Sequence, residues 1–377
     1  MSAPRAVAAL LAALALAVAG CASRGGLGEE TQDRLVAQVR ARGLDPHEIV
    51  IPFVADDEMR RWVREAVTTG GTPEERLEQL LRAILHREGE ELTYRRGVTA
   101  TAQEVWRTRV ANCLSFTHLY VGLARELQLP VYYLRVSDLQ NFEKDGDLVV
   151  ASEHVTAAYG PPSKRRVLDF TDRPVAEYHE IEQISDITAV ALYYSNLGAQ
   201  RIREGRSEEA HELLSIAVRL DPELGDGWVN LGVAERRLGH PDAAETDFRR
   251  ALEANPRLVS AYNNLASLLE RLGRPDEARG LLELTDRRGN RNPFSYLALG
   301  DLALRSGRLP EAERFYRRAQ RLDPGNAEPM AALGQWAIAA GKRREAERWL
   351  QRAEEIAPAQ PRVVELARSL RGAPPAG

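Results

Sequence analysis

The sequence is poor in cysteine and in net charge, and each shortage excludes a class of function. Cys21 and Cys113 are the only cysteines. If Cys21 is modified, the single remaining thiol excludes an internal disulfide and a zinc site built from cysteines. The net charge of -4 provides no basic excess for a phosphate backbone, so we expect no nucleic-acid partner. Because no glycine-rich loop follows a predicted strand, the sequence predicts no nucleotide or other cofactor, and it predicts no metal.

Long apolar segments are also scarce, and the clearest one lies at the N-terminus. After Arg5, the apolar run from Ala6 to Ala19 has about fourteen residues, fewer than the ~20 that a membrane-spanning helix needs. A positive charge, a short apolar run and small residues before Cys21 are typical of a secretory signal peptide. We therefore expect residues 1–20 to be a cleaved signal peptide. A permanent transmembrane anchor is the weaker alternative.

The six residues that end at Cys21, Leu-Ala-Val-Ala-Gly-Cys, resemble a bacterial lipobox. The resemblance implies that the thiol of Cys21 is acylated, and two or more acyl chains give stable membrane anchoring. Ala22 stands where a lipoprotein retained in the inner membrane usually carries aspartate, which favours the outer membrane. We expect a lipoprotein of the bacterial cell envelope that faces the periplasm, with residues 21–30 as a flexible tether.

A period of 34 residues runs through the C-terminal half and is the strongest pattern in the chain. Glycine recurs at this spacing in five units, at Gly205, Gly239, Gly273, Gly307 and Gly341. Alanine recurs at a second offset, at Ala210, Ala244, Ala278, Ala312 and Ala346. The pattern resembles the tetratricopeptide repeat, a pair of amphipathic helices. The glycine ends the first helix in a left-handed turn, and the alanine lets the two helices cross closely.

We therefore expect an all-α tetratricopeptide solenoid of five repeats over residues 191–358, followed by a capping helix and tail over residues 359–377. The resemblance implies a concave groove that binds a peptide or a partner protein. Asn196, Asn230 and Asn264 recur in the first helices and predict amides in that groove that bind a peptide backbone. The alternative is that these amides form hydrogen bonds between adjacent helices.

The part of the chain between the tether and the repeats, residues 31–185, combines two patterns. Apolar positions have helical spacing in residues 34–42, 57–68, 73–87, 101–109 and 113–128. The period then changes to two, which predicts strands over residues 131–136, 148–159 and 167–170. Helices followed by antiparallel strands predict an α+β domain.

Three residues of this predicted domain form a candidate active site. Cys113 begins a predicted helix behind Asn112, a residue type that caps helices, and the helix dipole at that end favours a thiolate. His154 lies on a predicted strand and Asp169 on the next one. A histidine can deprotonate the thiol while an aspartate fixes the histidine tautomer, so the three residues predict Cys-His-Asp catalysis. The other histidines show no partner at a spacing typical of a metal site.

The segment Thr99–Thr171 resembles the transglutaminase-like, papain-related superfamily. Cys113, His154 and Asp169 match its triad in order, spacing and predicted element. Asn112 replaces the glycine common before the cysteine, and Val155-Thr156 replaces the Ala-Trp that often follows the histidine. The resemblance implies acyl transfer or amide hydrolysis on a peptide or protein substrate. The alternative is a catalytically inactive scaffold for protein–protein interaction, in which the repeats bind the partner.

Overall fold

The computed structural model describes residues 29–87, 91–95, 97–145, 148–168, 181–287 and 292–372. The chain divides into two compact units. The first combines residues 1–141 and 151–254, and the second combines residues 142–150 and 255–377. Among the described residues, no helix is both long enough and apolar enough to cross a bilayer.

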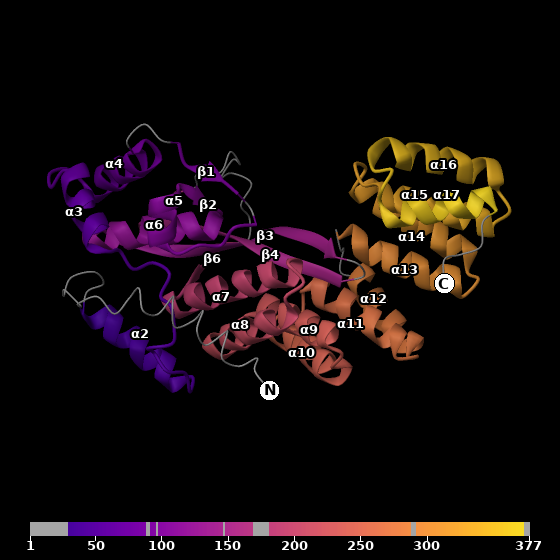
Figure 1. The fold of residues 1–377 in the computed structure, drawn as a ribbon, viewed down its shortest axis with the longest axis horizontal. Coiled ribbons are helices and arrows are strands. Elements are labelled where there is room, and N and C mark those ends of the chain that lie inside the picture. The colour runs from indigo at the N-terminus through magenta and orange to yellow at the C-terminus, as the bar shows by residue number, and fades with distance from the viewer. Residues whose placement is uncertain are drawn as a thin grey trace. The chain divides into compact units, whose positions relative to one another are not determined.

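Helices α2 to α6 come first in the chain (Figure 1). Their bounds are α2 Glu29–Ala41, α3 Asp57–Ala66, α4 Pro73–Leu85, α5 Ala102–Thr108 and α6 Cys113–Glu126. Two of the starts follow from capping boxes, in which Thr72 pairs with Glu75 and Thr101 pairs with Glu104. Each pair satisfies backbone N–H groups that have no partner inside the helix. Helices α3 to α6 begin within one residue of the predicted positions, whereas α2 begins at Glu29, five residues before its predicted start and inside the segment predicted as a tether.

A four-stranded sheet follows, with the strand order β5-β4-β3-β6. Its bounds are β3 Val131–Asp145, β4 Leu148–Tyr159, β5 Arg166–Leu168 and β6 Ile181–Ile184. Strands β4 and β5 pair in antiparallel orientation, with Ala157 opposite Leu168. Strands β3 and β6 are also antiparallel, with Tyr133 opposite Ile184. Two short strands, β1 Thr93–Tyr94 and β2 Val110–Ala111, form a separate parallel pair.

The sheet differs from the sequence prediction in two places. β3 continues to Asp145, although the apolar alternation ends at Val136. Residues 137–145 are mostly polar, so only their place beside β4 marks them as a strand. β6 was not predicted, because four residues with two polar ones in the middle carry little pattern of their own. Both parts depend on hydrogen bonds to a neighbouring strand.

Helix α6 is buried almost all round and packs against α3, α4 and α5. A side chain on Gly122 would overlap the backbone carbonyl of Phe53, so the glycine lets the helix lie against that segment. His118 of the same helix is fully buried, and its Nδ1 lies 3.0 Å from the hydroxyl of Tyr133. Burial, aided by the charge of Arg125, lowers the pKa of His118 to about 3. This histidine therefore stays neutral in the core at physiological pH.

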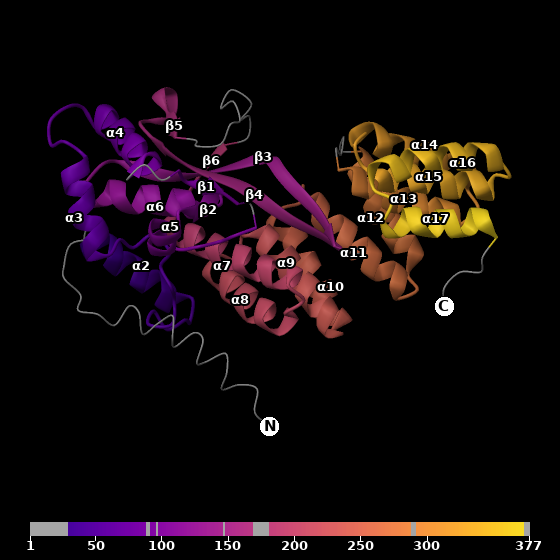
Figure 2. The same ribbon diagram turned by 45° about the horizontal axis from the view of Figure 1, so that its top comes forward.

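The remaining helices form pairs with the 34-residue period. The first unit contains α7 Asp186–Arg203 with α8 Ser207–Leu220, and α9 Gly225–Leu238 with α10 Pro241–Ala254. The second unit contains α11 Val259–Arg271, α12 Pro275–Arg287, α13 Pro293–Arg305, α14 Leu309–Leu322, α15 Ala327–Ala339, α16 Arg343–Ile356 and α17 Pro361–Arg371 (Figure 2). α7 begins before the predicted boundary at residue 191 because Ser185 caps it, accepting a hydrogen bond from the N–H of Thr188.

The recurring glycines and alanines have the roles that the repeat pattern predicts. The glycines after the first helices all have positive φ between 71° and 84°: Gly205, Gly239, Gly273, Gly307 and Gly341. This left-handed conformation ends each helix without the strain that a side chain would add. The alanines of the second helices are fully buried: Ala210, Ala244, Ala278, Ala312 and Ala346. The helical tetratricopeptide solenoid predicted for the C-terminal part is thereby confirmed.

A second glycine in the first helix lets a large side chain of the second helix approach. A Cβ on Gly232 would lie 2.6 Å from the ring of Phe248, and a Cβ on Gly300 would overlap the ring of Tyr316. Gly198 stands in the same relation to Leu214. In each pair the second residue follows the first by sixteen positions. The close crossing of the two helices thus depends on a residue without a side chain.

We expect Gly300→Ala to destabilise the second unit although alanine is the better helix former. The added methyl group has no space beside Tyr316, and overpacking costs about 1–3 kcal/mol. Gly280→Ala is the matched control, because Gly280 is an exposed glycine of α12 with nothing within 4 Å of the new methyl group. It should stabilise the protein by up to about 1 kcal/mol. Thermal or urea unfolding measures the stability of both variants. If Gly300→Ala and Gly280→Ala changed the stability in the same direction, this helix packing would be contradicted.

Candidate functional site

Cys113 is the first residue of α6, and the structure caps this helix as the sequence predicts. Asn112 accepts a hydrogen bond from the N–H of Ser115 at 2.8 Å. Its own amide nitrogen donates to the hydroxyl of Thr99 at 3.1 Å, which fixes the side chain. The sulfur of Cys113 therefore lies at the positive end of a helix dipole, where an anion is favoured.

The structure brings His154 of β4 to Cys113. A side-chain hydrogen bond joins the imidazole and the thiol. Thr117 supports this contact from the next turn of α6, because its hydroxyl lies 2.8 Å from the carbonyl oxygen of Cys113 and 3.2 Å from that of Val155. The start of α6 is thus tied to the strand residue that follows His154. His154 itself is 7% exposed.

The thiol of Cys113 lies in a setting that favours its ionised form. Burial by itself would raise the pKa of this thiol. The hydrogen bond and the charge of His154 act in the opposite direction, as do backbone hydrogen bonds from Val155 and Leu114, and together they hold the pKa below its ordinary value. The thiolate is the nucleophilic form of cysteine, so this arrangement is chemically suited to attack on a carbonyl carbon.

Two of the predicted site residues lie outside the described residues. Asp169 follows Leu168, the last residue of β5, whose carbonyl oxygen accepts a hydrogen bond from Thr156 at 2.8 Å. Cys21 and the predicted signal peptide precede residue 29, where the described part of the chain begins. The roles of Asp169 and Cys21 therefore stay predictions.

The three recurring asparagines differ in exposure. Asn230 and Asn264 are buried, with exposed fractions of 1% and 0%, and Asn196 is half-buried. The amide nitrogen of Asn230 lies 3.5 Å from the hydroxyl of Ser195 in the preceding repeat. This contact is of the kind that the alternative interpretation describes, a hydrogen bond between adjacent helices. Peptide binding by the three amides stays a prediction.

Two histidines to which the sequence assigned no role share one carboxylate. Nε2 of His211 lies 2.9 Å from one oxygen of Glu235, and Nδ1 of His240 lies 2.7 Å from the other. Glu235 therefore links α8, α9 and the turn before α10. Burial, together with the charge of Glu235, raises the pKa of nearby Asp247 to about 7. Spacing along the sequence gave no signal for this cluster, because its members lie on different elements of the chain.

The second unit contains a groove of about 880 Å³ that sequence analysis did not locate. Its lining comes from α13, α15, α17 and the residues just before α17. These are the first helices of the last two repeats and the terminal helix. The lining includes the polar residues Asp301, Gln335, Arg362 and Glu365 and the apolar residues Leu304 and Ile338.

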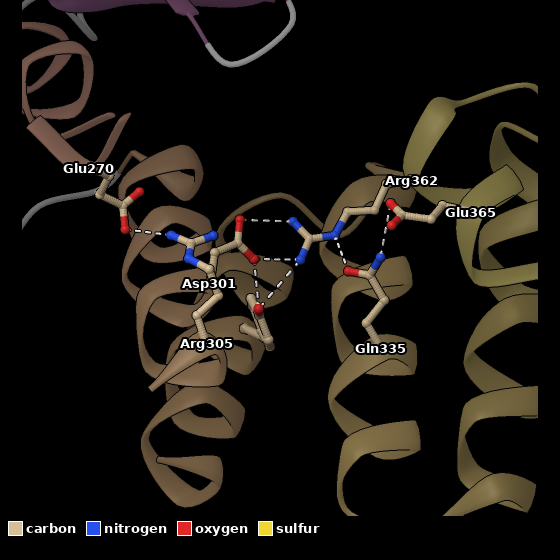
Figure 3. Close-up of polar contacts among 7 residues, drawn as sticks. Glu270, Asp301, Arg305, Gln335, Arg362 and Glu365 are labelled. Atoms are coloured by element: carbon tan, nitrogen blue, oxygen red, sulfur yellow. Dashed lines mark hydrogen bonds and ion pairs between the residues drawn. The ribbon is translucent and has the colours of Figure 1, made fainter. Parts of the chain in front are cut away.

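Arg362 of α17 lies at the centre of a polar network in this groove (Figure 3). Its Nη2 and Nη1 donate to the two carboxylate oxygens of Asp301 at 2.5 and 3.2 Å, and its Nε donates to the amide oxygen of Gln335 at 2.7 Å. The amide nitrogen of Gln335 donates to Glu365 at 3.3 Å. Tyr316 donates to Asp301 at 2.6 Å. The network connects α17 with α13 and α15.

Comparison with known proteins identifies the repeats. Residues 229–293 and residues 303–370 each match a family model described as tetratricopeptide repeat. None of the curated proteins matches the chain.

Several solved structures resemble about half of the chain. A tetratricopeptide protein from Thermus thermophilus is 22% identical over 48% of this chain and 97% of its own, with a TM-score of 0.42. PilF of Pseudomonas aeruginosa is 20% identical over 50% of this chain and 86% of its own, with a TM-score of 0.43. PilW, described as a widely conserved type IV pilus biogenesis factor, is 21% identical over 48% of this chain and 85% of its own, with a TM-score of 0.44. The two family models, and not these structures, identify residues 229–293 and 303–370 as tetratricopeptide repeats, as the 34-residue period predicts.

Proposed function

We propose that this protein binds a segment of a partner polypeptide through its tetratricopeptide repeats. The observation that carries the proposal is the groove along α13, α15 and α17. Its volume of about 880 Å³ lies in the range of ligand sites in proteins, about 300–1,000 Å³. Stacked helical repeats present extended surfaces of this kind to other proteins. Peptide binding accounts for the groove without requiring any chemical step.

The binding proposal is tested with the full chain and fluorescein-labelled dodecapeptides of randomised sequence, by fluorescence anisotropy. We expect a subset of peptides to bind saturably, with dissociation constants on the order of 1 μM. Gly300→Ala should weaken binding because the packing beneath the groove is disturbed. Cys113→Ser should leave binding unchanged because the repeats provide the contacts. Absence of saturable binding, or its loss in Cys113→Ser, would contradict the proposal.

A second function, acyl transfer by Cys113, is favoured by the hydrogen bond between its thiol and His154. The thiolate would attack the carbonyl carbon of a glutamine carboxamide or a peptide amide, and a tetrahedral intermediate would form. The C–N bond then breaks, and the imidazolium of His154 gives its proton to the departing amine. Water or a second amine resolves the thioester. Water gives hydrolysis and an amine gives cross-linking.

Two other groups have roles in this reaction scheme. The backbone N–H of Cys113 is one donor for the developing oxyanion, since it lies in the first turn of α6. Asp169, the residue after the last one of β5, would orient the imidazole and fix its tautomer. The resemblance to transglutaminase-like enzymes supports this scheme. In the alternative, the α+β part keeps such a fold without the activity, and the protein acts as a scaffold alone.

The rate of alkylation of Cys113 against pH separates these alternatives. In a Cys21→Ser background, the native thiol should react with iodoacetamide at about pH 6, because its lowered pKa keeps the thiolate present below the ordinary value of about 8.5. His154→Ala should move the midpoint upward. Asp169→Asn should slow the reaction. The Cys21→Ser protein unfolded in urea is the control for a free thiol. If the native protein gave the same curve of alkylation rate against pH as this control, Cys113 would be an ordinary cysteine.

The proposed place of action is the bacterial cell envelope. The lipobox-like residues before Cys21 support acylation of that cysteine, with anchoring to a membrane and exposure of the protein to the periplasm. Ala22 supports the outer membrane over the inner membrane. Partner binding by the repeats would then take place at the membrane surface.

We expect Cys21→Ser to release the protein from the membrane fraction, because no acyl chains can be attached. Ala22→Asp should keep the acylation but move the protein to the inner membrane. Cys113→Ser is the matched control and should leave attachment unchanged. Fractionation of cells on a sucrose gradient, with immunoblotting after a high-salt wash, measures all three. Retention of the Cys21→Ser protein on membranes would show that the lipid anchor was wrongly assigned.

A further inference from the structure

The groove of the second unit carries an excess of negative charge. Its charged lining residues are Asp301, Glu328 and Glu365 against Arg305 and Arg362, three carboxylates against two guanidinium groups. Arg305 is already paired with Glu270, a carboxylate outside the lining. The lining therefore carries a net charge of -1, and the ion pair with Glu270 offsets the charge of Arg305. The excess favours a cationic ligand.

The guanidinium of Arg362 is already occupied by partners within the protein. It forms hydrogen bonds with Asp301, Gln335 and Tyr316, at distances from 2.5 to 3.4 Å. Burial by itself would lower the pKa of Arg362, but the charges of Asp301 and Glu328 raise it well above its ordinary value. This arginine stays charged and neutralises part of the acidic excess. Because its donors are used internally, it does not offer the bidentate clamp that an anionic ligand requires.

The carboxylates are held in place before any ligand binds. Asp301 accepts hydrogen bonds from both Arg362 and Tyr316, and it is 28% exposed at its side chain. Glu365 is exposed and accepts a hydrogen bond from the side-chain amide of Gln335. Fixed polar groups lose little conformational entropy when a ligand arrives. The two acidic side chains are therefore partly exposed and preorganised, and the contacts that hold them are drawn in Figure 3.

Apolar surface lies beside these acidic groups. Ile338 of α15 is 37% exposed, and it lines the same groove. Leu304 of α13 is half-buried and adds to the surface. An aliphatic side chain placed against Ile338 would remove apolar area from water, at about 25 cal/mol per Å². The groove thus offers an apolar contact next to an anionic one.

We propose that the groove of α13, α15 and α17 binds an extended segment of a partner protein in which a lysine or arginine stands next to an aliphatic residue. The cationic side chain pairs with Asp301 and Glu365, and the aliphatic side chain packs on Ile338 and Leu304. The inference rests on the proposed polypeptide binding by the repeats and names the chemistry of the segment that they bind.

Two peptide libraries test this inference with the full chain by fluorescence anisotropy. Both contain fluorescein-labelled dodecapeptides with randomised flanks, one around a central Lys-Leu and the other around a central Glu-Leu. We expect the Lys-Leu library to bind at least about tenfold more tightly, and its affinity to fall as salt is raised. Equal binding of both libraries, or preference for Glu-Leu, would overturn the inference and leave polypeptide binding intact. Failure of both libraries would remove the proposed function as well.

Substitutions locate the binding within the chain. Glu365→Arg should weaken binding of the Lys-Leu library about tenfold or more, because it reverses the charge of an exposed groove residue. Glu354→Arg, the same change at an exposed position of α16 outside the groove lining, is the matched control and should have no effect. Ile338→Ser is a second groove variant that keeps every charge and should also weaken binding. The inference would be overturned if both groove variants unfolded at the same temperature as the parent protein and bound the Lys-Leu library with unchanged affinity.

Discussion

The close crossing of the two helices of each repeat is the contact on which much of the structure depends. At this crossing a glycine of the first helix leaves room for a large side chain of the second, as Gly232 does for Phe248 and Gly300 does for Tyr316. The fully buried alanines of the second helices allow the same approach from the other side. Protein interiors are packed tightly, so an extra methyl group at such a point is costly. This packing recurs in the first, second and fourth repeats, whereas the third has Ala266 in place of the glycine and Gly334 of the fifth packs on Leu366 of α17.

The groove of the second unit is a consequence of the same crossing. Tyr316 packs on Gly300 with its ring and holds Asp301 with its hydroxyl. Asp301 in turn holds Arg362, which reaches from the terminal helix α17 to α13. The ring that determines the helix spacing therefore also fixes the first carboxylate of the groove. The fold and the binding surface share a residue, so a change at Tyr316 acts on both.

The sequence predicted features that come from local or recurring signals. The repeats follow from a period, and the contact of Cys113 with His154 follows from a capped helix and an alternating strand. The groove could not be predicted, because its charges occur once. At the 34-residue spacing Asp301 aligns with Gln335 and Ser369, which carry no charge. The end of β3 and all of β6 were missed because pairing with neighbouring strands, rather than their own residues, makes them strands.

In the proposed complex, a partner segment binds where the packing of the repeats has fixed the carboxylates of the groove. Hydrogen exchange of the full chain, with and without a saturating Lys-Leu dodecapeptide, locates the bound segment on the protein. Backbone amides that become ordered by a ligand exchange more slowly. We expect slower exchange in α13, α15 and α17, with the other described helices unchanged. Protection confined to α7–α10 or to the helix that begins at Cys113, with none in these three helices, would contradict it.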